Sequence, residues 1–188
     1  MIRSSALRPF APIFLALALL GTFPGGANAF NLGARAGYGS AEGDDEGSPS
    51  LGAYARFDLP GPVNLELAGD AWTSERSQGR IEARTLPLQA SALLYPFPSV
   101  LIKPSLLGGA GITMVRLKSL EGTSAERDDH LFSFQAGAGF DVPLPLLVLT
   151  ADLRYFFTEE LTADVGGIPE KPYRPGGWRL TAGAALKF

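Results

Sequence analysis

The sequence has no cysteine and a single histidine, His130, among its 188 residues. The absence of cysteine excludes a disulfide scaffold, a thiol nucleophile and a thiolate metal site. One histidine cannot build a multi-histidine metal centre. Basic residues do not dominate either, with 16 Lys and Arg against 19 Asp and Glu, which argues against a nucleic-acid partner because that needs a basic face. We therefore expect no metal, no cofactor and no nucleic acid.

Long apolar runs are missing beyond the N-terminus, so no membrane-spanning helix is expected there. Residues 1–29 resemble a cleaved secretory signal: basic residues precede an apolar stretch over 10–23, and Ala27 and Ala29 supply the small residues that signal peptidase requires. The apolar stretch is shorter than the roughly 20 residues of a membrane anchor. We predict a signal peptide over 1–29 and one folded domain over 30–188.

Apolar and polar residues alternate along most of this domain. In residues 178–188 the even positions are wholly apolar and the odd positions are mixed, and residues 132–142 and 147–157 repeat the pattern. A period of two is typical of a β-strand with two different faces. Each span has the length of a tilted transmembrane strand. Less regular strands bring the expected total to eight, near 30–39, 50–59, 63–74, 80–95 and 100–117.

The connections favour an up-and-down arrangement. Pro-x-Pro turns at 60–62, 96–98 and 143–145 separate neighbouring strands, because proline cannot sit inside a paired ladder. Longer polar connections alternate with these short turns, near 40–49, 75–80, 118–130 and 159–176. The alternation puts all short turns and both termini at one end. The sequence therefore predicts an all-β fold, an eight-stranded up-and-down antiparallel barrel.

The composition of the two faces favours a membrane barrel over a soluble one. A water-exposed outer face would carry long charged side chains, whereas the polar face here is rich in glycine, as suits a narrow lumen. These glycines are Gly33, Gly37, Gly52, Gly109, Gly111, Gly137, Gly139 and Gly183.

Aromatic residues gather near the strand ends, as expected at membrane interfaces. One girdle is expected near the short turns, from Phe30, Phe57, Tyr95, Phe140 and Phe188. The other is expected near the long loops, from Tyr38, Phe132, Tyr155, Phe157 and Trp178, with Trp72 joining only if a bulge or strand end turns it outward.

The last strand carries a resemblance to a known family. Apolar residues occupy every second position and end on an aromatic one, at Leu180, Ala182, Ala184, Leu186 and Phe188. This pattern resembles the C-terminal assembly signal of bacterial outer-membrane β-barrels, and the whole domain resembles the small OmpA- or OmpX-like class. The resemblance implies a Gram-negative outer membrane, periplasmic termini, recognition by the barrel-assembly machinery, contact with lipopolysaccharide, and a monomer.

Strand parity places ten charged residues inside the barrel: Arg35, Arg56, Glu66, Asp70, Lys103, Asp141, Asp152, Arg154, Arg179 and Lys187. Eight strands leave an interior just wide enough for side chains, and buried charges need partners. We therefore predict an ionic, hydrogen-bonded plug. The alternative interpretation of these charges is a selective pore.

The strand over 80–95 is ambiguous. The parity that turns Leu86 and Leu88 toward lipid also turns Glu82 and Arg84 outward. Either the strand extends beyond the bilayer, or a bulge near Pro87 resets the register. The extended strand is the preferred prediction.

The case for catalysis or metal binding is weak. His130 and Ser133 are the residues from which a lipid-modifying hydrolase could be built, but parity places them on opposite faces. The acidic residues of the loops over 40–49 and 118–130 lack the spacing of a Ca²⁺ loop, and we expect them to be solvated. The sequence thus predicts a non-enzymatic outer-membrane barrel with a structural or surface-interaction role through its long acidic loops. The alternatives, in order, are a small pore or transport accessory, a lipid A-modifying enzyme, and a soluble periplasmic barrel.

Overall fold

The computed structural model describes residues 30–42, 46–76, 81–97, 101–119, 126–159, 164–165, 168–169 and 174–188. The predicted signal peptide over 1–29 lies outside these residues and stays a prediction. No helix in the described part of the chain is long and apolar enough to cross a membrane.

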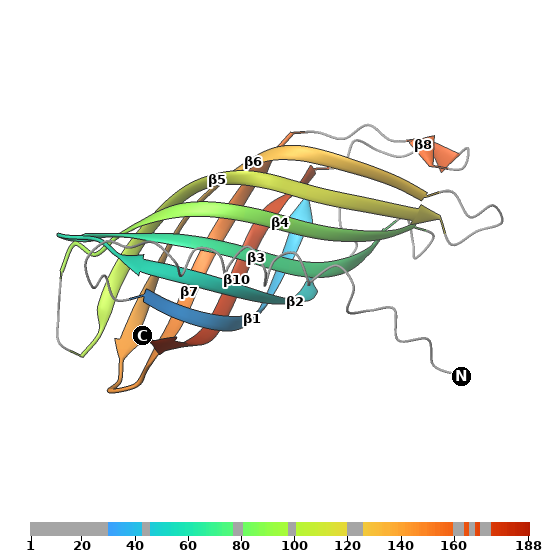
Figure 1. Ribbon diagram of the computed structural model, residues 1–188. Helices are drawn as coiled ribbons and strands as arrows, with labels where there is room; N and C mark the ends of the chain where they lie inside the picture. The colour runs from blue at the N-terminus through green and yellow to red at the C-terminus, as the bar shows by residue number, and fades with distance from the viewer. Residues whose placement is uncertain are drawn as a thin grey trace, which may run out of the picture.

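Eight antiparallel strands of the described chain close into one barrel, in the order β1-β10-β7-β6-β5-β4-β3-β2 (Figure 1). Their bounds are β1 Phe30–Glu42, β2 Ser48–Asp58, β3 Val63–Arg76, β4 Ile81–Leu94, β5 Lys103–Ser119, β6 Glu126–Pro143, β7 Leu147–Thr158 and β10 Arg174–Lys187. The predicted fold class is therefore confirmed. The small hairpin of β8 (Asp164–Val165) and β9 (Ile168–Pro169) stands within the last long connection, which was expected to be a plain loop.

The first and last strands close the barrel, pairing from Asn31 opposite Lys187 along the strands. Phe30 and Phe188 exchange two backbone hydrogen bonds, of 3.3 and 2.9 Å, and their rings stack with centroids 4.9 Å apart. Both ends of the domain therefore lie beside the turns at 59–62 and 144–146. We call this the short-turn end, and the opposite end the long-loop end. Figure 1 shows the C-terminus at the first and the β8–β9 hairpin at the second.

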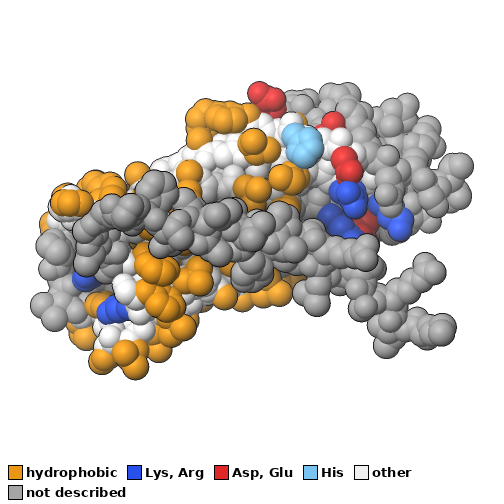
Figure 2. Space-filling model, in the orientation of Figure 1, with side chains coloured by type: hydrophobic (Ala, Val, Ile, Leu, Met, Phe, Trp, Pro, Cys, Tyr) orange, Lys and Arg blue, Asp and Glu red, His pale blue; other side chains and the backbone are white. Residues whose placement is uncertain are grey.

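The outer wall is an apolar belt. Large hydrophobic side chains stand exposed around the barrel, among them Leu51, Leu106, Leu153, Leu180 and Phe134, and Figure 2 shows them spread over its side. A patch of this extent is not viable against water. Charged residues instead fill the interior, so the two faces have the inverted polarity of a membrane barrel.

Two predicted girdle residues, Trp72 and Tyr95, lie in the lumen instead. Trp72 is 5 % exposed and Tyr95 is 8 % exposed. No bulge turns Trp72 outward, because β3 keeps one register with β4 on both sides of it. It therefore shares the inner face with Asp70, as plain alternation requires. Tyr95 follows β4 directly and keeps the inward parity of Ser91.

The register of β4 resolves the ambiguity in favour of the extended strand. β4 pairs with β5 without a break from Ile81 to Leu94. The pairing between β3 and β4 is interrupted at Pro87 but keeps the same register on both sides, because proline removes one donor without adding a residue. Glu82 and Arg84 consequently face outward, toward the long-loop end.

Most of the predicted long loops are shorter than expected. β5 runs to Ser119 and β6 begins at Glu126, so most of 118–130 belongs to a hairpin. The connections over 40–49 and 75–80 shrink in the same way. The composition turns polar there because the strands leave the apolar belt, not because they leave the sheet. Backbone pairing continues into water, where either face can be polar.

Candidate functional site: an ionic network in the barrel lumen

Strand alternation and glycine together make room for the charged side chains. Gly183 pairs with Arg35 across the β1–β10 seam, and Gly137 pairs with Arg154 across β6 and β7. A Cβ at Gly52 would lie 2.0 Å from the carboxylate of Asp70. Inward glycines therefore leave the space that long charged side chains need.

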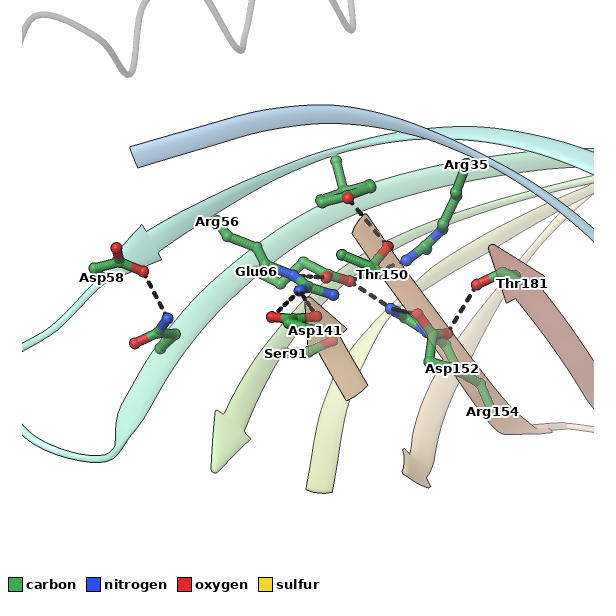
Figure 3. Close-up of polar contacts among 12 residues, drawn as sticks. Arg35, Arg56, Asp58, Glu66, Ser91, Asp141, Thr150, Asp152, Arg154 and Thr181 are labelled. Carbon is green, nitrogen blue, oxygen red and sulfur yellow. Dashed lines mark hydrogen bonds and ion pairs between the residues drawn. The ribbon is translucent and has the colours of Figure 1, made fainter. Parts of the chain in front are cut away.

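Glu66 is the centre of the network. Its side chain is fully buried, and its carboxylate accepts hydrogen bonds from three arginines on three different strands. The distances are 3.1 Å to Arg35, 2.6 Å to Arg56 and 2.7 Å to Arg154. Figure 3 shows how Arg56 and Glu66 lie together between the strands. One carboxylate thus ties β1, β2 and β7 to β3.

Each of these arginines also holds a second carboxylate. Arg35 donates to Asp70 from Nε at 2.8 Å and also from Nη2. Nη1 of Arg56 donates to both oxygens of Asp141, at 2.8 Å each. Arg154 donates to Asp152 from two nitrogens.

Hydroxyl groups complete the carboxylate shells. Thr181 donates to Asp152 at 2.9 Å, and Tyr95 donates to Asp141 at 2.7 Å. Buried charges are costly unless paired and hydrogen-bonded, and these carboxylates meet both conditions. We call this set the ionic network. Its charged members are Arg35, Arg56, Arg154, Glu66, Asp70, Asp141 and Asp152.

Three of the ten residues predicted to face the lumen stand apart from this network. Arg179 is buried and lies over the ring of Trp72, with its guanidinium carbon 3.6 Å from the ring centroid. Trp72 packs in turn against Phe156. Lys103 and Lys187 face the open mouth at the short-turn end, where Lys187 donates to the backbone carbonyl of Leu144 at 2.6 Å.

A neutral hydrogen-bonded layer was missed by the sequence analysis. Gln89 and Thr113 both donate to the hydroxyl of Ser133, at 2.7 and 2.9 Å, and Gln135 donates to Ser91 at 2.6 Å. Tyr54 was also missed: it is fully buried and its hydroxyl lies 3.2 Å from that of Thr150. Parity would have found all of these: Tyr54, Thr113, Ser133, Gln135 and Thr150 share a face with predicted lumen residues, and Gln89 and Ser91 lie opposite the outward leucines of β4.

The lumen offers little for catalysis. Ser133 is fully buried inside the barrel, whereas His130 is exposed on the outer wall, so the two cannot form a nucleophile–base pair. Among the described residues, no three His, Cys, Asp or Glu side chains are placed to hold a metal ion. What the arrangement does is tie strands together through side-chain hydrogen bonds and ion pairs.

The residues of the C-terminal pattern all lie on the outer wall. Leu180, Leu186 and Phe188 are 56 %, 55 % and 62 % exposed, and Ala182 and Ala184 are exposed between them. The strand thus presents one continuous apolar face to the surroundings.

A closed barrel of eight strands with an apolar outer wall and an ion-paired interior defines the class of small outer-membrane β-barrels. No protein-family model matches the chain, and no curated protein matches its sequence. Solved structures do match in fold, with Neisserial surface protein A among them at a TM-score of 0.63. That match has 15 % identity and covers 85 % of this chain and 96 % of the other.

Two further barrels match in the same way. Ail, the attachment invasion locus protein of Yersinia pestis, matches at a TM-score of 0.56 and 12 % identity, over 86 % of this chain and 99 % of the other. The N-terminal barrel domain of Pseudomonas aeruginosa OprF matches at 0.55 and 16 % identity, over 87 % and 100 %. At such identities the likeness shows the fold alone, and it is the fold that the sequence predicted.

Proposed function

We propose that the protein is a monomeric outer-membrane barrel of a Gram-negative bacterium with a structural or surface-interaction role. Residues 1–29 would direct export to the periplasm, and the barrel-assembly machinery would read the outward apolar face that ends at Phe188. The apolar belt supports the membrane location. A sheet that crosses the hydrocarbon of a bilayer must close into a barrel, because every backbone polar group needs a hydrogen-bond partner there. The sheet of this protein is closed.

The ionic network is the observation that carries the structural role. It crosses the lumen from β2 to β6 through Arg56 and Asp141, and from β3 to β7 through Glu66 and Arg154. All four side chains are less than a tenth exposed. The interior of an eight-stranded barrel is just wide enough for side chains, so a lumen filled by side chains has no room for a continuous water path. The network therefore acts as a plug, and the function falls to the outer surface and the long-loop end.

Single-channel recording in planar bilayers tests the plug. We expect no stable, large openings from the purified protein, with a general porin as the positive control. Stable, large openings would overturn the plug and favour the alternative function, a small pore.

Cysteine labelling tests the orientation, since the chain contains no cysteine of its own. His130→Cys at the long-loop end should react with a membrane-impermeant maleimide on intact cells. Leu101→Cys, an exposed site near the short turn between β4 and β5, should react only after the outer membrane is permeabilised. The opposite result would place the termini outside.

The same long-loop end is where lipopolysaccharide and a surface partner would be met. Its outer wall carries charged pairs, with Arg116 donating to Asp128 and Arg84 donating to Glu82, each at 2.6 Å. Figure 2 shows basic and acidic side chains close together on the surface toward that end. A non-enzymatic role predicts that His130→Ala leaves the acylation pattern of lipid A unchanged, and an altered pattern would revive the hydrolase alternative.

A further inference from the structure

The barrel has a cavity of about 700 Å³ at the short-turn end, which we call the vestibule. Residues from β1, β2, β3, β5, β6, β7 and β10 line it, so it is the mouth of the barrel itself. Its volume lies within the ~300–1,000 Å³ range of small-molecule sites. The vestibule lies on the opposite side of the network from the long loops.

Side chains that span the lumen form the floor of the vestibule. The hydroxyl of Tyr54 on β2 meets that of Thr150 on β7, and Arg56 on β2 grips Asp141 on β6. Tyr95 donates to the same aspartate from a third side. The ring of Tyr54 packs so close to Gly33 that a Cβ there would lie 2.6 Å from it. The vestibule therefore ends at this floor, as a binding pocket does.

The vestibule carries more cationic than anionic groups. Its lining includes Arg56, Lys103 and Lys187 against Asp58 and Asp141, which is three positive charges against two negative ones. Asp141 pairs with Arg56, which leaves the two lysines facing the single carboxylate of Asp58, and Asp58 also accepts a hydrogen bond from the amide of Asn64 at 2.6 Å. The surplus charge is therefore positive.

Two of the cationic donors in the vestibule are unused. In the described part of the chain, Lys103 makes no hydrogen bond and no close ion pair, although it interacts electrostatically with the carboxylate of Asp58. Arg56 uses Nε and Nη1 in the network, while its Nη2 makes no hydrogen bond there. Register brings the two together, because Lys103 pairs directly with Asp141, the partner of Arg56. Lys187 lies two strands away from Arg56 at the same level of the barrel, because Asn31 on β1 pairs with Lys187 on β10 and with Arg56 on β2.

We propose that the vestibule binds a small organic anion, a carboxylate or a phosphate ester. Lys103 and the unused nitrogen of Arg56 donate to its anionic oxygens, because charge-assisted hydrogen bonds are the strongest that such groups make. The aliphatic wall of Leu59, Pro62 and Val148 covers its carbon skeleton. This binding site goes beyond the proposed structural role, and it does not depend on whether ions can pass through the lumen.

Titration calorimetry on the full chain in detergent micelles tests the proposal with matched probes. Succinate is compared with succinamide, which has nearly the same shape without the charge, and glucose 6-phosphate is compared with glucose, which lacks the phosphate group. We expect at least one anion to bind saturably, at least about tenfold more tightly than its neutral partner, a tenfold difference being about 1.4 kcal/mol.

Lys103→Gln should weaken that binding about tenfold, since one charge-assisted donor is lost. The Lys103 side chain makes no hydrogen bond with the network, although its backbone pairs with Asp141, so this variant should fold, and heat-modifiable migration on gels checks that it does. Lys118 is an exposed lysine on the outer wall at the long-loop end, so Lys118→Gln is the matched control and should bind as the unaltered protein does. Equal binding of charged and neutral probes, equal affinity of the two lysine variants, or no saturation with either anion would each overturn the site.

Discussion

Removing the charge of Glu66 should destabilise the barrel more than any other single isosteric change in the lumen. In Glu66→Gln, three charge-assisted hydrogen bonds of 2.6 to 3.1 Å are weakened at once. Each hydrogen bond to a charged group contributes roughly 1.5–3 kcal/mol. The full sum overstates the loss, because every one of the three arginines keeps a second carboxylate and the glutamine oxygen still accepts. We expect a loss of about 3–5 kcal/mol, as when one partner of a buried pair is removed.

Reversible urea unfolding in micelles measures this loss, followed by tryptophan fluorescence and by migration of folded barrel on unheated gels. Glu82→Gln is the control. It removes the same charge from a pair on the outer wall, where the Arg84 side chain is 66 % exposed, and such pairs contribute about 0–1 kcal/mol. If Glu66→Gln costs no more than Glu82→Gln, the network is not what holds the lumen together.

Three other predictions test the two faces and the seam. Ala184→Arg should cost about 2–4 kcal/mol because it places a charge in lipid, whereas Ala184→Leu should be neutral; a clash in the leucine variant, seen as poor folding, would mean that the residue faces inward. Brominated lipid should strongly quench the fluorescence of Trp178, measured in Trp72→Phe, where it is the remaining tryptophan. It should only weakly quench Trp72, measured in Trp178→Phe. Equal quenching would mean that Trp72 faces the lipid. Phe188→Ala should slow insertion into lipid vesicles relative to Leu146→Ala, since it removes the ring that stacks on Phe30 at the seam; equal rates would remove that role.

The faces of the strands were predictable because side chains alternate strictly along a strand. Arg35, Glu66 and Arg154 lie in the lumen where parity placed them. The fold followed from the same pattern, since strands with one apolar and one polar face, joined by short turns, have few closed arrangements. Even Tyr54 and Gln89 were within reach of this argument. Neither residue carries a charge that marks it as internal, although an uncharged side chain fills a lumen equally well.

What could not be predicted was how the lumen residues pair. Asp70 binds Arg35, a residue 35 positions away in sequence, and Arg56 binds Asp141, a residue 85 positions away. The first contact spans one intervening strand and the second crosses the barrel, so both depend on shear and on side-chain length rather than on alternation. Trp72 was uncertain for a different reason. An aromatic residue near a strand end suggests an interface, but a neighbouring cation, Arg179, can hold it inside.

The charged interior also explains why the strand register is unique. If the inner residues of β7 were apolar, either face of the strand could contact lipid. A register shift of one residue would then cost little free energy. With Asp152 and Arg154 inside, the same slip turns both toward hydrocarbon. An arginine there costs about 2–4 kcal/mol at the midplane, and an aspartate somewhat less, which together approach the lower end of the roughly 5–15 kcal/mol stability of a folded domain. The slip also strips Glu66 of its Arg154 partner. The ionic network therefore favours the register that keeps the charged face inside on the strands that carry its members, β1, β2, β3, β6 and β7.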